Sequence, residues 1–170
     1  MCGPRKEATM IIVPHQGVNR TRFGMSRAEV AGSIGALARR GRRGEHDLSD
    51  LDFFDAFGIK VSYDANGCCN AIEFNRWFGT NLEYDGYRLF DHPAREVRAW
   101  ALAKDPQLDP KDGFTSKALG LGMWADWIDE RDLEPDELLD PGMSFIIFRP
   151  GYFEEEHARM VAAGLLPGDS

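Results

Sequence analysis

A run of acidic residues with one histidine is the segment whose composition comes closest to that of a metal site. His46 and Asp47 are soon followed by Asp50, Asp52 and Asp55. Imidazole and carboxylate groups are suitable metal donors, but a metal ion needs ligands that converge on one point. These residues extend over a loop and the short apolar stretch after it, so we do not expect them to converge. We interpret the run as a solvated acidic loop and expect no metal.

The other residue types that catalyse reactions are dispersed along the chain. The remaining histidines are His15, His92 and His157. Their spacing matches no metalloprotease pattern, and no serine lies in a Gly-x-Ser-x-Gly motif. Cys68 and Cys69 follow a turn at Gly67, with no basic residue within two positions that would stabilise a thiolate. We therefore expect no catalytic residue, no cofactor and no enzymatic activity.

Basic residues gather in one segment, Arg39–Arg43, which contains four arginines. Arginines bind phosphate, but here no aromatic side chains are interleaved with them, and the whole chain carries a net charge of −8. The segment is typical of an exposed, solvated loop. Weak nucleic-acid binding through this loop is the third of the functions that the sequence allows, after the two given at the end of this section.

Aromatic residues next to charged ones are the features that best suit a binding surface. Large aromatic side chains act as anchors in protein interfaces, and an acidic segment complements a basic partner. Each aromatic also has an alternative role in the core, because a sheet must be covered. The candidate partner-binding residues are Trp77, Phe78, Tyr84, Tyr87, Trp124, Trp127, Asp129, Glu130, Asp132 and Glu134.

Length and composition are those of one globular domain. The chain has 170 residues, 43% hydrophobic and 28% charged, which is enough to bury a core without disulfides. An odd number of cysteines without a Cys-x-x-Cys pair favours a reducing compartment. The apolar run Met10–Val13 is too short for a signal peptide or a membrane span. We expect a cytoplasmic protein with no membrane partner.

The first half of the sequence predicts a helix followed by a β-hairpin. Residues Ser26 and Glu29 form a capping box, in which each side chain accepts a hydrogen bond from the backbone of the other residue. The apolar stripe of this helix consists of Val30, Ile34 and Leu37, and Gly35 lies near its end. Phe57–Tyr63 alternates apolar and polar residues, Asn66-Gly67 favours a tight turn, and Cys68–Phe74 forms the returning strand.

The second half repeats the order of these elements. Pro93 lies in the first turn of a helix over 94–104. Two strands follow, at 120–125 and 144–148, and a long acidic insertion, 126–140, replaces the tight turn between them. A final helix is expected over 154–163, with Gly164 as its stop signal.

These elements predict an α+β fold of two tandem helix-plus-β-hairpin repeats, with the helices packed on one face of a mainly antiparallel sheet. We expect a flexible tail over residues 1–9 and a single domain over 10–153, followed by a C-terminal helix and tail over 154–170. Repeat one covers about 17–75 and repeat two about 84–150. The two copies align best where Phe23–Val30 matches Phe90–Val97.

Three segments carry a resemblance to known proteins: Phe23–Val30, Phe57–Asp64 and Ala71–Phe74. In this order they resemble uncharacterised bacterial cytosolic proteins, and the first is similar to a helix start in the β-lactamase-inhibitor-protein-like fold and in the small lipoprotein of the outer-membrane assembly machinery. The resemblance covers about residues 10–153. It implies a tandem layered fold whose sheet face binds another protein. This chain lacks the signal peptide, lipidated cysteine and paired cysteines of the secreted relatives, so their targets do not transfer.

We therefore expect a non-enzymatic, protein-binding module that uses a sheet face and the acidic segment 126–140. Its most concrete form is a cytosolic immunity protein that blocks a basic toxin site. The alternative is an enzyme or small-ligand-binding protein with a pocket between the repeats.

Overall fold

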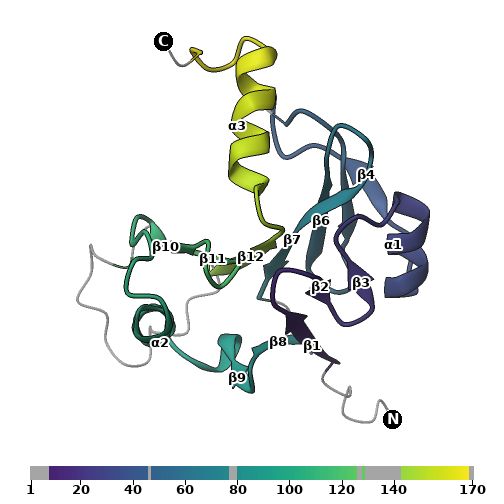
Figure 1. The fold of residues 1–170 in the computed structure, drawn as a ribbon. Coiled ribbons are helices and arrows are strands. Elements are labelled where there is room, and N and C mark those ends of the chain that lie inside the picture. Colours follow the sequence, from purple (N-terminus) through teal and green to yellow (C-terminus); the bar gives the residue numbers. More distant parts are fainter. Residues whose placement is uncertain (1–7, 46, 77–79, 126–127, 129–142, 169–170) are drawn as a thin grey trace, which may run out of the picture.

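The described part of the chain forms an α+β fold with three α-helices and two mainly antiparallel sheets. The computed structural model describes residues 8–45, 47–76, 80–125, 128 and 143–168 (Figure 1). The helices are α1 (Arg27–Ile34), α2 (Ala94–Lys104) and α3 (Tyr152–Ala162), with a 3₁₀ turn at Leu89–Asp91. The strands are β1 (Ala8–Val13), β2 (Gly17–Val18), β3 (Thr21–Arg22), β4 (Arg39–Gly41), β5 (Leu51–Phe54), β6 (Ile59–Tyr63), β7 (Cys69–Asn75), β8 (Thr80–Tyr84), β9 (Tyr87–Arg88), β10 (Gly113–Ser116), β11 (Leu121–Trp124) and β12 (Ser144–Phe148).

The larger sheet has seven strands in the order β10-β11-β12-β7-β6-β5-β4, and every neighbouring pair is antiparallel. Its centre is the β7–β12 pair, where Phe74 lies opposite Phe145. The predicted hairpin around Asn66-Gly67 is confirmed as β6 and β7. Both predicted strands of the second half are present as β11 and β12.

A second sheet, in the order β3-β2-β1-β8-β9, corrects the expectation of a single sheet. β1 and β8 pair in parallel, with Met10 opposite Leu82, although more than 70 residues separate them in the sequence. Local periodicity carries no information about such a distant pairing. For this reason the segment that precedes Tyr84 was not predicted as a strand.

The helix ends follow the predicted local signals. Ser26 and Glu29 form the capping box of α1, and Gly35 ends the helix in a left-handed conformation with a φ of 76°. α2 begins directly after Pro93, and Gly164 turns the chain just beyond α3 with a φ of 76°. Leu37, predicted in the apolar stripe of the first helix, is instead 96% exposed, because α1 ends before it.

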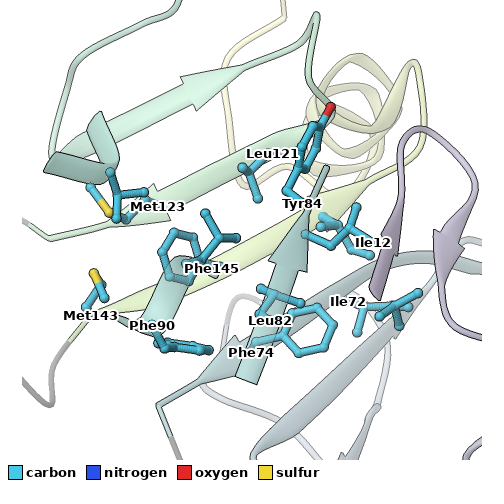
Figure 2. Close-up of a cluster of buried hydrophobic side chains, with 14 of the residues drawn as sticks. Ile12, Ile72, Phe74, Leu82, Tyr84, Phe90, Leu121, Met123, Met143 and Phe145 are labelled. Carbon is cyan, nitrogen blue, oxygen red and sulfur yellow. The ribbon is translucent and has the colours of Figure 1, made fainter. Parts of the chain in front are cut away.

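The two sheets and the first two helices share one buried apolar cluster. Val30 of α1 and Val97 of α2 belong to the same cluster as Ile72 and Phe145 of the larger sheet and Leu82 of the smaller one. Figure 2 shows Leu82 and Tyr84 facing the side chains of Phe74, Phe145 and Leu121. Burying one such aliphatic side chain stabilises the fold by about 1.5–3 kcal/mol. One core therefore joins residues from both halves of the sequence.

The first three residues of the arginine-rich segment, Arg39–Gly41, form an edge strand, β4, whereas Arg42 and Arg43 lie outside any strand, so the predicted loop is wrong in part. β4 pairs with β5, with Arg39 opposite Phe53. The Arg39 guanidinium lies 4.5 Å from the centre of the Phe53 ring and donates to Asp55 at 3.0 Å. Charged side chains on a short edge strand discourage pairing with another chain. The high charge of this segment therefore hid its strand character.

Candidate functional site

The two faces of the seven-stranded sheet differ in what covers them. Along β6, Ile59 and Val61 point into the core, and Lys60 points to the other side. We call this second side the outer face. The register brings one residue from each of five neighbouring strands into a row across it. These residues are Lys60, Glu73, Ile146, Gly122 and Thr115.

The outer face contains a hollow of about 660 Å³. Gly122 lies on its floor, where a Cβ atom would be 3.0 Å from the Cγ2 atom of Ile146. The hollow keeps its depth at this point because a glycine occupies the position. Phe153, at the start of α3, and Asp109, before β10, line two other parts of the wall.

Trp124 is the most prominent apolar group of this hollow. It ends β11, lies opposite Ser144 of β12, and leaves 53% of its surface exposed. Phe153 in the same lining is 37% exposed. A tryptophan in this position is the kind of side chain that dominates protein interfaces. Trp124 was among the predicted partner-binding residues, and here it lies in an open hollow of the sheet.

The lining is polar and charged, and its hydroxyl groups include those of Ser144 and Thr115. Within the described part of the chain, no histidine or cysteine lines the hollow. Burial, followed by the nearby Glu156 carboxylate, raises the pKa of the Tyr152 hydroxyl to about 12. That phenol therefore stays protonated at neutral pH. Arg43 forms an ion pair with Glu73, so the one glutamate in the lining is already engaged.

Each described aspartate of the acidic run that was considered as a metal site forms an ion pair with a different arginine. Asp52 is 4% exposed; it accepts from the Arg27 guanidinium at 2.6 Å and from the Tyr63 hydroxyl at 2.7 Å. Burial, and then this hydrogen bond to Asp52, raises the pKa of Tyr63. Among the described residues, no three His, Cys, Asp or Glu side chains are grouped as a metal would need. His46 lies outside the described residues.

Carboxylates also neutralise most of the arginine-rich segment. Three of its four arginines form ion pairs: Arg39 with Asp55, Arg42 with Asp50, and Arg43 with Asp47 and Glu73. Exposed pairs of this kind add little stability, but they reduce the positive potential that phosphates would need. The geometry therefore gives no support to nucleic-acid binding through this segment.

The other predicted aromatics have different surroundings. Tyr84 is only 3% exposed, and its hydroxyl donates to the Leu119 carbonyl at 3.0 Å, so it is a core residue. Tyr87 is stacked between His92 and Trp100, with ring centres 4.3 Å and 4.5 Å away. Neither residue lines the hollow. The predicted site residues outside the described part of the chain are Trp77, Phe78, Trp127, Asp129, Glu130, Asp132 and Glu134.

None of the five residues in the row across the outer face was among the predicted site residues: Lys60, Glu73, Ile146, Gly122 and Thr115. The alternation in Phe57–Tyr63 was the available signal for Lys60, because it places that residue opposite the buried positions. No such signal existed for Ile146, whose strand consists almost entirely of apolar residues. The pairing of β12 with β7 alone assigns it to this face.

Comparison of the chain with models of known protein families, with curated proteins and with solved structures finds no significant match. None of the described helices combines the length and apolar composition needed to cross a bilayer.

Proposed function

We propose that this chain is a non-enzymatic, protein-binding module that receives another protein on the outer face of its seven-stranded sheet. The observation that carries the proposal is the open hollow of about 660 Å³ with the half-exposed Trp124 in its lining. A sheet face that α3 covers only in part, with an aromatic anchor and a charged surround, has the composition of a protein interface.

The extent of the outer face favours a protein over a small ligand. A second hollow of about 470 Å³ adjoins the first beyond β10 and shares Asp109 and Phe153 with it. A third, of about 350 Å³, adjoins it near β5 and shares Lys60 and Asn75. Seven strands at ~4.8 Å spacing and about five residues in length give a face of roughly 29 by 17 Å. Tyr152 and Phe153 of α3 cover Phe148 on this face, so the part left open is smaller than the full area of roughly 500 Å² and supplies only part of one side of a standard interface.

We also infer that the sheet was built from two diverged copies of one unit. Strands β5-β6-β7 and β12-β11-β10 lie on either side of the β7–β12 boundary, in an order that a two-fold rotation would exchange. Gly58 and Gly120 precede β6 and β11 with φ angles of 66° and 64°. Each has a carbonyl that accepts from the next strand of its own unit, from Asn75 and Phe148 respectively. We therefore propose a single domain over about residues 10–153 that contains both copies.

The distribution of charge favours a basic partner surface. Residues 126–142 contain eight carboxylates and one arginine, so they account for seven of the chain's eight net negative charges. Trp124 and Ser144, which lie two positions before and two positions after this segment, both line the hollow. The immunity protein proposed from the sequence, which covers a basic toxin site, agrees with this charge. Complementary charge would mainly speed association and select the partner.

The proposal can be tested by comparing three variants of the chain as bait in lysate from its native host. The wild type should retain a specific protein, and Trp124→Ala should weaken that binding by about 30-fold or more, as expected for a tryptophan anchor. Leu102→Ala is the matched control, because Leu102 is 48% exposed on α2, which does not line the hollow. Retention that Trp124→Ala leaves unchanged would refute the assignment of this face.

A small ligand is the competing occupant, because a volume of about 660 Å³ lies within the range of ligand sites. It would appear as thermal stabilisation of the purified chain by metabolites, lost in Trp124→Ala, with no protein retained. That combination of results would replace the protein-binding proposal.

A further inference from the structure

The hollow of about 350 Å³ beside β5 has two basic side chains in its lining, Lys60 and Arg76. Lys60 comes from the middle of β6 and also lines the larger hollow, and Arg76 directly follows β7. The side chains of Asn75 and Phe53 lie in the same lining. Two cations from neighbouring strands therefore border one depression of the outer face.

Two carboxylates that share the lining or the strand register with these cations are engaged elsewhere. Asp55 lines the same hollow but accepts from Arg39 at 3.0 and 3.2 Å. Glu73 lies opposite Lys60 in the β6–β7 register but forms its ion pair with Arg43. Each carboxylate that Lys60 would be expected to bind thus has an arginine of its own.

Lys60 and Arg76 are left without partners among the described residues. No hydrogen bond or ion pair joins either side chain to another described residue, and the Nη1 atom of Arg76 is buried without an acceptor. In a chain with a net charge of −8, two unpaired cations in one hollow require a specific explanation.

We propose that Lys60 and Arg76 form a carboxylate-binding subsite that takes an Asp or Glu side chain of the protein partner. This inference rests on the proposed function, since the subsite lies at the margin of the proposed interface. A carboxylate only accepts hydrogen bonds, and its two oxygens match the fork of a guanidinium group. A single carboxylate suits this site better than a polyanion, which the net charge of the chain would repel. The partner would therefore present one acidic side chain at this edge of an otherwise basic surface.

The test uses small carboxylates as probes on the purified full-length chain, followed by ¹H–¹⁵N NMR at constant ionic strength. Acetate and glutarate should shift the amides of Lys60, Asn75 and Arg76 saturably, with chloride as the reference anion. The double variant Lys60→Gln/Arg76→Gln should weaken this binding at least tenfold. Lys111→Gln is the matched control, because Lys111 lines the large hollow but not the smaller one.

Saturable shifts that disappear only in the double variant support the subsite. The absence of saturable shifts in the wild type would overturn it without any variant having to fold. Binding of inorganic phosphate in preference to both carboxylates would overturn the assignment to an acidic side chain. A partner that is captured through Trp124 while acetate does not bind would refute the subsite alone. Acetate binding without any Trp124-dependent partner would refute the protein-binding function and leave the anion site standing.

Discussion

The buried ion pair between Arg27 and Asp52 gives a stability prediction with an internal control. Asp52 is 4% exposed and accepts from both Arg27, at 2.6 Å, and Tyr63, at 2.7 Å. Asp52→Ala would leave the Tyr63 phenol without its acceptor and the Arg27 guanidinium with only the Asp50 carbonyl. Breaking a buried pair costs about 3–5 kcal/mol, but Arg27 retains 26% exposure, so we expect about 3 kcal/mol. For a chain of this length that corresponds to a fall in Tm of roughly 6–12 °C.

The control variant is Asp55→Ala, which removes a second aspartate–arginine pair close to the first in sequence. Arg39 and Asp55 have side chains that are 61% and 65% exposed, so water replaces the lost contact. Its Tm should stay within error of the wild type. Urea denaturation followed by circular dichroism measures both free energies of unfolding. Equal losses for Asp52→Ala and Asp55→Ala would refute the reasoning, because burial would then have no bearing on the cost.

Three further predictions concern positions in the outer face and next to it. The added side chain of Gly122→Val should press against Ile146 and lower the free energy of unfolding, measured in urea, by about 1–3 kcal/mol. It should also weaken partner capture because it fills the hollow. Unchanged capture would show that the partner does not use the floor of the hollow. Burial alone would raise the pKa of Asp64, but backbone N–H groups and Arg149 outweigh it and lower that pKa. The ionised Asp64 carboxylate therefore stabilises the fold above the unfolded-state pKa of about 3.9, and this stabilisation is lost as the pH falls through the lower folded pKa. Asp64→Asn should flatten a plot of Tm against pH between about 2 and 5. Burial raises the pKa of the Cys69 thiol to about 12. In a variant whose other cysteines are replaced by serine, a disulfide reagent at pH 8 should react with Cys69 only after unfolding. Rapid reaction in the native state would contradict the burial of Cys69.

Local sequence signals predicted the parts of the fold that local interactions determine. The Ser26–Glu29 capping box, the Asn66-Gly67 turn and the stop at Gly164 each act within a few residues, and all three are present. The parallel pairing of β1 with β8 joins segments far apart in the sequence. Periodicity within one segment cannot specify a partner at that distance, so the second sheet was missed.

The sequence identified a residue of the candidate site only where the residue type and its sequence neighbours indicated a role. Trp124 was identified because aromatic side chains next to charged residues act as anchors in protein interfaces. Gly122 and Ile146 contribute through the register of β11 and β12, which the sequence does not encode locally. Tyr84 shows the opposite case, because its flanking charges suggested an interface whereas the structure places it in the buried apolar cluster.

Site-specific photo-cross-linking tests the central claim, that another protein binds the outer face, most directly. A photoreactive phenylalanine analogue replaces Ser144, which lines the hollow, or Leu37, which is 96% exposed and lies outside it. Both proteins are irradiated in native-host lysate together with the wild type. We predict a discrete cross-linked protein from position 144 that an excess of wild-type chain displaces and that is absent from position 37. Equal products from both positions, or none from position 144, would contradict the account.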